Sequence, residues 1–159
     1  MKTSLSFTLT TTIIAAIISC TSIENTSKNA NLITNKVMGK KYSIDVRMAE
    51  PMRGKTVPLS YGYELTVKAD TAYAYLPYYG VAQRVPYGNT DGGIKFKETI
   101  KDYSIHPNKK ENGWDISFSV DGRDYDYRIN LSVFDNGNAT ITVNSADRDV
   151  ISFWGEVKR

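Results

Sequence analysis

From residue 42 onward, apolar and polar side chains alternate along the chain with a period of two. That period is typical of a β-strand that buries one face and exposes the other. Turn signals such as Asp121-Gly122 and Asn136-Gly137 separate successive alternating segments, as they do in β-hairpins. The segments that we predict as strands span residues 42–48, 61–68, 71–76, 94–96, 114–120, 125–133, 139–143 and 150–154. The sequence therefore predicts an antiparallel all-β domain of about eight strands, as a sandwich or a partly open barrel.

Residues 1–19 do not follow this alternation. Lys2 is the only Lys, Arg, Asp or Glu before Cys20, and an apolar run over residues 13–18 leads into Ser19-Cys20. A positive start, an apolar centre and a small-residue exit are the parts of an export signal. The ending Ile17-Ile18-Ser19-Cys20 also resembles a bacterial lipobox, in which the cysteine is lipidated and becomes the first mature residue. We predict a lipoprotein signal peptide over residues 1–19 and a lipid anchor on Cys20. Ordinary secretion and a retained membrane anchor are the alternatives.

Composition sets limits on the mature chain. Removing residues 1–19 from the 159 leaves 140 residues, a size that suits one domain with its own core. The formal charge falls from +3 to +2 with the loss of Lys2, so we expect no nucleic-acid partner. Cys20 is the only cysteine, so no intramolecular disulfide can form and the domain must fold by burying apolar side chains.

Residues 20–40 join the predicted anchor to a single domain over residues 41–159. Their first part is rich in Asn, Ser, Thr and Lys and predicts a tether. Ala30, Ile33 and Val37 have roughly helical spacing before Gly39, where a helix would end. We therefore expect a tether before the β-domain, with one short helix as an open alternative for its second part.

Four short motifs resemble a known family. They are Leu76-Pro77-Tyr78-Tyr79-Gly80, Gly92-Gly93-Ile94-Lys95-Phe96, Gly113-Trp114 and Ile151-Ser152-Phe153-Trp154-Gly155. In order and spacing they resemble the family numbered 4251 among domains of unknown function, whose members are small envelope lipoproteins of Bacteroidetes. The resemblance runs from about Leu32 to Val157. It implies an exported, lipidated all-β protein, and it brings no catalytic residues because the family has no assigned activity.

A tyrosine-rich segment is the strongest candidate for a binding site. Its candidate ligand-binding residues are Tyr75, Tyr78, Tyr79, Arg84 and Tyr87. Such a segment could line a cleft for a sugar or another flat amphipathic ligand, with the arginine as a polar anchor. The alternative is that the tyrosines pack at the rim of the core, where a proline and a glycine turn the chain.

The sequence offers little for catalysis or metal binding. His106 is the only histidine, we place it in a solvent-exposed loop, and no Gly-x-Ser-x-Gly segment accompanies it. One histidine and a lipidated cysteine cannot build an ordinary zinc site, and the aspartates near residues 121–126 lack the spacing of a calcium loop. We therefore predict no enzyme activity, no catalytic residues, no metal and no cofactor.

Asp70-Thr71-Ala72 resembles the short acceptor motif for periplasmic O-glycosylation in the same bacterial group. The motif falls at a predicted turn, where a side chain is exposed to solvent. Thr71 is therefore a candidate glycosylation site, and the alternative is a chance match to so short a motif.

Together these features predict a protein held in the bacterial envelope by Cys20, on the periplasmic side of the outer membrane. Thr21 lacks the aspartate that retains some lipoproteins in the inner membrane, and Glu24 is the only acidic residue close behind Cys20. Two function classes fit such a protein. One is a module that binds a small ligand, and the other is an interaction or scaffolding lipoprotein that binds a protein partner through a sheet face or edge.

Overall fold

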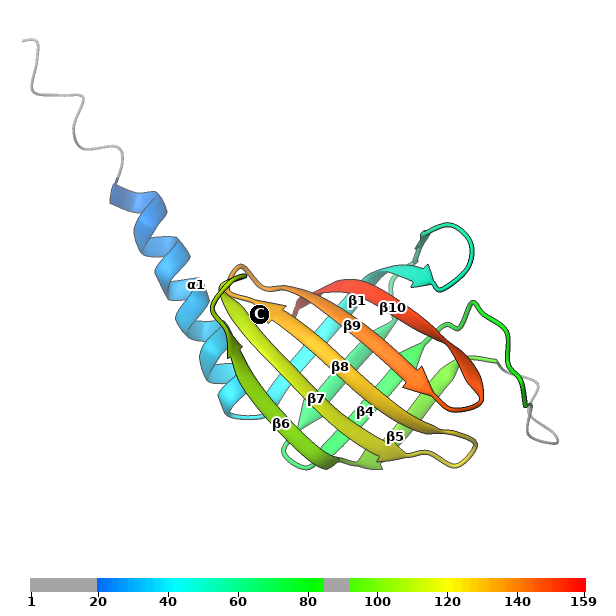
Figure 1. Ribbon diagram of the computed structural model, residues 1–159. Coiled ribbons are helices and arrows are strands. Elements are labelled where there is room, and N and C mark those ends of the chain that lie inside the picture. The colour runs from blue at the N-terminus through cyan, green and yellow to red at the C-terminus, as the bar shows by residue number, and fades with distance from the viewer. Residues whose placement is uncertain (1–19, 85–91) are drawn as a thin grey trace, which may run out of the picture.

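The computed structural model describes residues 20–84 and 92–159 (Figure 1). In these residues one helix precedes ten strands, and every strand pairing is antiparallel. The elements are α1 (Cys20–Met38), β1 (Lys41–Pro51), β2 (Val57–Pro58), β3 (Glu64–Lys68), β4 (Thr71–Leu76), β5 (Ile94–Thr99), β6 (Lys101–Asn108), β7 (Gly113–Asp121), β8 (Asp126–Phe134), β9 (Asn138–Ser145) and β10 (Arg148–Val157). The predicted signal peptide, Tyr87 and most of the turn predicted over residues 89–93 lie outside the described residues.

The strands form one sheet whose two ends meet. The order is β5-β4-β3-β1-β10-β9-β8-β7-β6, with the short β2 paired to β1. The end strands β5 and β6 are consecutive in sequence and are separated only by Ile100. The first half of this bent segment pairs with β4 and the second half pairs with β7, so the sheet curls round on itself (Figure 1). The result is a nearly closed barrel, which confirms the all-β prediction and selects the partly open barrel over the sandwich.

Alternating side chains fill the barrel. In β8 the inward residues Ile129, Leu131 and Val133 are at most 2% exposed, because alternate residues of a strand share a face. In β4 the alanines and Leu76 take the inward positions, so Tyr73 and Tyr75 point outward and are more than a third exposed. The predicted turn at Asn136-Gly137 is confirmed, and Gly137 there adopts φ 95°.

The structure has two more strands than the sequence analysis identified. The two-residue β2 is too short to show a period. The sequence pattern does not predict β6, because β6 is an edge strand whose residues are all exposed or half-buried. Its sequence therefore lacks the alternation that a buried face produces. The assignment of His106 to a loop was therefore wrong: His106 is an exposed residue in the middle of β6.

The C-terminal half of α1 packs on one end of the barrel, while its first half projects away from the sheet (Figure 1). Ile33 and Val37 are 4% and 0% exposed, and the indole Nε1 of Trp114 donates a hydrogen bond to Thr34 Oγ1 at 3.3 Å. The helix stops where predicted, with the Gly39 N–H donating to the Asn35 carbonyl at 2.9 Å. Over residues 20–84 and 92–159, no helix combines the length and apolar character that a membrane span requires.

Candidate functional site

The sheet does not close along one stretch, at the end of the barrel opposite α1. The pairing of β6 with β7 starts at Lys101, opposite Ser119, and residues 94–99, which belong to β5, do not pair with β7. Between β5 and the turn that joins β7 to β8 lies a cleft of about 420 Å³, which we call the seam cleft. Its lining residues are Gly93, Lys95, Phe96, Lys97, Glu98, Gly122, Arg123, Asp124, Tyr125 and Tyr127.

Three aromatic rings line the seam cleft. Phe96 from β5 and Tyr127 from β8 are stacked, with ring centroids 5.5 Å apart and planes inclined by 28°. Tyr125, in the β7–β8 turn, lies 6.2 Å from Tyr127. Each of these residues is at most 7% exposed, and burial raises the pKa of Tyr127 to about 12, so its hydroxyl stays neutral. The rings give the cleft an apolar, partly covered surface.

Charged side chains surround these rings. The lining carries three basic residues, Lys95, Lys97 and Arg123, against two acidic residues, Glu98 and Asp124. Arg123 Nε lies 3.5 Å from Asp124 Oδ1, and Lys95 Nζ lies 4.8 Å from the centre of the Tyr75 ring. The formal net charge of the residues that line the cleft is therefore +1.

Arg148, the first residue of β10, is the one charged side chain in the buried core of the described residues. It is 7% exposed, and its Cζ lies 4.0 Å from the centre of the Tyr125 ring and 4.5 Å from that of Tyr78. Within residues 20–84 and 92–159, no group forms a hydrogen bond with its Nε or Nη1. Contacts with two aromatic faces stabilise the cation, although they return only part of the cost of burying it.

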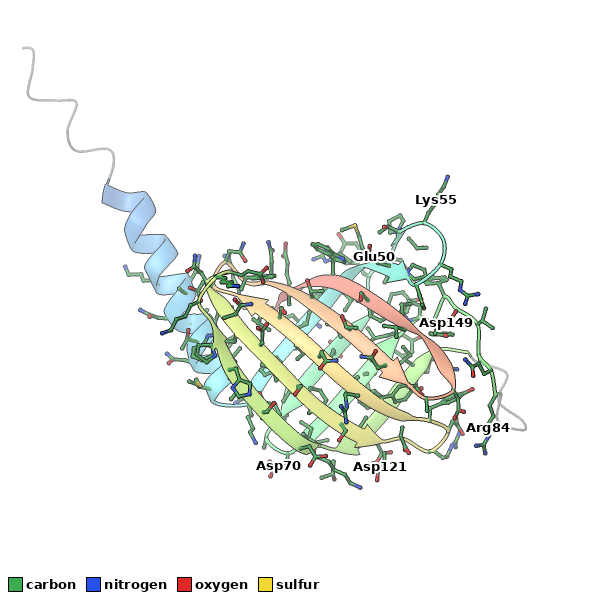
Figure 2. The ribbon with its side chains drawn as sticks, viewed as in Figure 1. Glu50, Lys55, Asp70, Arg84, Asp121 and Asp149 are labelled. Carbon is green, nitrogen blue, oxygen red and sulfur yellow. The ribbon has the colours of Figure 1, made fainter. Side chains whose placement is uncertain are left out.

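Residues 77–84, which we call the cover segment, cross the barrel end beside Arg148. Two backbone hydrogen bonds of 2.8 and 3.1 Å join the cover segment to residues 147–149. The Tyr125 hydroxyl donates to the Arg84 carbonyl at 2.8 Å. Figure 2 shows Arg84 and Asp149 at this same end of the barrel. The cover segment therefore links β10 to the rim of the seam cleft.

The structure separates the tyrosines that the sequence grouped into one candidate site. Tyr75 stacks on Tyr63 on the outer face of the barrel, with centroids 5.6 Å apart. Tyr78 turns toward Arg148, and its hydroxyl lies 3.0 Å from the Val81 carbonyl. Burial, with Asp149 as a smaller contributor, raises the pKa of Tyr78.

The remaining candidates do not complete a tyrosine pocket. Tyr79 is 38% exposed on the cover segment, Arg84 contributes its backbone carbonyl, and Tyr87 lies outside the described residues. None of the described candidates, Tyr75, Tyr78, Tyr79 or Arg84, lines the seam cleft. The segment as a whole nevertheless lies beside the cleft, because Tyr78 and Tyr125 contact the same guanidinium.

The sequence did not predict the seam cleft, although Gly93, Lys95 and Phe96 belong to one of the four family motifs. Phe96 and Tyr127 fit the strand pattern as ordinary core positions, and Arg148 follows a short polar stretch that is typical of an exposed turn. Only the pairing of distant strands brings these residues together. An arginine beside turn residues indicates a binding site only if it is known to be buried, and the local sequence does not show burial.

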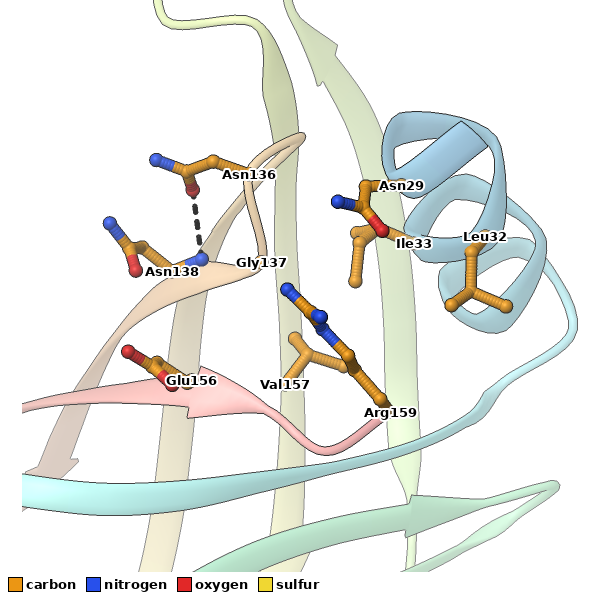
Figure 3. A pocket seen from close by; sticks show the side chains of 9 residues that line it. All are labelled: Asn29, Leu32, Ile33, Asn136, Gly137, Asn138, Glu156, Val157 and Arg159. Atoms are coloured by element: carbon orange, nitrogen blue, oxygen red, sulfur yellow. Dashed lines mark hydrogen bonds between the residues drawn. The ribbon is translucent and has the colours of Figure 1, made fainter. Parts of the chain in front are cut away.

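A second hollow lies between α1 and the β8–β9 turn (Figure 3). Its volume is about 100 Å³, and Ile33, Gly137 and Val157 contribute to its lining. The Asn138 N–H donates to Asn136 Oδ1 at 2.9 Å at its edge. This space suits a few water molecules, so it is a packing feature of the helix–barrel junction rather than a ligand site.

An exposed apolar patch lies on the outer face of β1, β9 and β10. Trp154 and Met48 are paired across β10 and β1 and are 48% and 39% exposed. The Trp154 indole donates to Glu50 Oε2 at 3.1 Å, and Phe134 lies beside the patch in a shallow hollow of about 260 Å³. We call this the Trp154 patch.

The described residues bring together no triad for nucleophilic catalysis. His106 pairs across strands with Asp115, but the Asp115 carboxylate accepts a hydrogen bond from Ser132 at 2.8 Å. The serine thus donates to the acid and not to the histidine, which a nucleophilic serine requires as its base. Among residues 20–84 and 92–159, no three His, Cys, Asp or Glu side chains gather as metal ligands.

Comparison with known proteins places the chain by fold and by family. It is similar in structure to a DUF4251 family protein from Bacteroides eggerthii, with a TM-score of 0.63, 17% identity, and coverage of 82% of this chain and 87% of the other. No curated protein matches the chain. The family model described as "Domain of unknown function (DUF4251)" matches residues 24–157. The chain therefore belongs to the DUF4251 family, as its four motifs predicted.

Proposed function

We propose that this protein is a lipid-anchored, non-catalytic binding module of the bacterial envelope, which holds a small ligand in the seam cleft. The observation that carries the proposal is the gap in the barrel between β5 and the β7–β8 turn. There a cleft of about 420 Å³ combines three aromatic rings with five charged side chains. Small-molecule sites in proteins have this size and this mixture of apolar surface with a few polar groups.

Ligand capture from an envelope extract tests the binding module. The full chain with Cys20→Ser would be incubated with the extract and examined by native mass spectrometry. We expect an added mass in the small-molecule range, below about 1 kDa. Lys97→Ala with Arg123→Ala should reduce the bound fraction, since both residues line the cleft. Lys109→Ala with Lys110→Ala, which removes the same charge from the β6–β7 turn, should leave it unchanged.

The proposed anchor is tested separately. The sequence places Cys20 at the end of a lipobox-like segment, and α1 begins at that residue. We expect a tagged fatty acid fed to the bacteria to label the wild-type protein and not the Cys20→Ala variant. Labelled protein should fractionate with the outer membrane and resist protease added to intact cells. A protein released without label would instead indicate ordinary secretion.

A second candidate function is an interaction or scaffolding lipoprotein that binds a protein partner. The Trp154 patch favours it, because an exposed Trp beside an exposed Met is unusual on a free surface and common in interfaces. Trp154→Ala should then abolish capture of a protein partner and leave the small-molecule mass unchanged. Tyr61→Ala is the matched control, because that ring is 84% exposed and not part of the patch.

A further inference from the structure

Arg148 carries a positive charge that the described residues leave without a partner. Its side chain is 7% exposed, and its Nε and Nη1 form no hydrogen bond with residues 20–84 or 92–159. Buried charges in proteins are normally paired or hydrogen-bonded, because desolvation of an isolated charge is costly. Two of its nitrogens are thus available to donate to an anionic partner that the described residues do not supply.

Two carboxylates near Arg148 are directed to other groups. Asp149 Oδ2 accepts a hydrogen bond from the Val81 N–H at 3.3 Å and lies 4.0 Å from Arg53 Nε. Asp124 Oδ1 lies 3.5 Å from Arg123 Nε, on the exposed side of the β7–β8 turn. Neither Asp149 nor Asp124 forms an ion pair with Arg148.

The ring of Tyr125 lies between the Arg148 guanidinium and the seam cleft. Tyr125 lines the cleft and also contacts Arg148, with 4.0 Å from Cζ to the ring centre, while Tyr78 lies at 4.5 Å. Guanidinium hydrogen bonds to carboxylate and phosphate lie in the plane of the group and leave its faces free for aromatic contacts. Lys97 and Arg123 add positive charge along the route of approach.

We propose that the ligand of the seam cleft is an anion with a carboxylate or phosphate group, and that Arg148 receives this group. The inference rests on the proposed function, because it names the chemistry of the ligand for the same cleft. To reach Nε and Nη1, the anionic group passes the Tyr125 ring, which then releases its hydroxyl from the Arg84 carbonyl on the cover segment. The bound anion supplies the hydrogen-bond partner that residues 20–84 and 92–159 do not provide for Nε and Nη1.

Thermal unfolding with simple anions tests this inference. The full chain with Cys20→Ser would be heated in sodium phosphate, sodium glucuronate or sodium chloride at matched ionic strength. We expect phosphate or glucuronate to raise the midpoint of unfolding, saturably and beyond chloride. Arg148→Met should abolish that rise, and its affinity for the anion should fall at least about tenfold, because charge-assisted hydrogen bonds are lost. The two anions distinguish a phosphate-bearing from a carboxylate-bearing ligand.

A second measurement tests the same inference if Arg148→Met fails to fold. In the wild-type chain, the Nε–H resonance of Arg148 should shift during titration with the effective anion. An unmoved resonance, or an equal response of wild type and Arg148→Met, would overturn the inference. A neutral ligand captured from the extract and indifferent to Arg148→Met would also overturn it, while leaving the binding module intact. Failure to capture any ligand, with the anion response present, would count against the proposed function alone.

Discussion

Phe96 and Tyr127 stack at 5.5 Å, although their strands β5 and β8 are not neighbours in the sheet. Aromatic contact thus joins the two sides of the barrel where backbone pairing does not. We expect Phe96→Ala to lower the free energy of unfolding by about 3–5 kcal/mol, as truncation of a buried Phe does. A double-mutant cycle with Tyr127→Ala, measured by urea denaturation, should give a coupling energy of about 0.5–1.5 kcal/mol. Additive effects of the two changes would show that the rings do not cooperate.

The same tyrosine predicts a loss of stability in alkaline solution. Burial raises the pKa of Tyr127 from 10.0 to about 12 in the folded protein. Between those values the unfolded chain loses the proton and the folded chain keeps it, so the free energy of unfolding falls as pH rises. Below pH 10 this contribution is fully present. Denaturation of wild type and Tyr127→Phe across this range should show a shallower fall for the variant, and parallel curves would contradict the assignment.

Gly155 should tolerate no side chain. A Cβ there would lie 2.3 Å from the backbone carbonyl oxygen of Asp45, where β10 and β1 approach closely. Gly155→Ala forces two paired strands apart, so we expect a destabilisation of about 1–3 kcal/mol or more in chemical denaturation. Gly92→Ala is the control, because a Cβ at Gly92 meets no atom within 4 Å. Equal stability of both variants would contradict this account of the Trp154-Gly155 motif.

The contact of α1 with the barrel can be tested with two adjacent residues. Ile33 is 4% exposed against the β8–β9 turn, while Leu32 is 41% exposed. We expect Ile33→Ala to cost about 2–5 kcal/mol of unfolding free energy and Leu32→Ala to stay within about 0.5 kcal/mol. If both changes leave the denaturation midpoint unmoved, the helix is a tether that the barrel does not need.

Thr71 remains a predicted glycosylation site. It is an exposed residue at the start of β4, directly after the turn at Ala69 and Asp70, so a glycan there would meet solvent. We expect the peptide containing Thr71, isolated from the native envelope, to carry a glycan mass that Thr71→Ala abolishes. An unmodified peptide from the same material would end the hypothesis.

The alternation of apolar and polar residues predicted most of the strands. The period of two in segments such as residues 125–133 arises because each strand of the barrel buries one face in the interior and exposes the other. The bend at Ile100 was not predictable in the same way, because β6 is an edge strand with no buried face. Nor was the burial of Arg148, which depends on a cover segment about seventy residues earlier in the chain. Candidate sites built from distant contacts of this kind leave no trace in local sequence.

The pairing of β1 with β10 has a consequence for how the chain reaches its native state. Strand β1 lies between β3 and β10, with Ile44 opposite Val157, so one of its neighbours is distant in the sequence. Such non-local pairing forms slowly, because the entropy of closing the intervening loop must be overcome before the contacts can form. Until β10 pairs with it, one edge of β1 is open, and an open strand edge is a template for pairing with another chain.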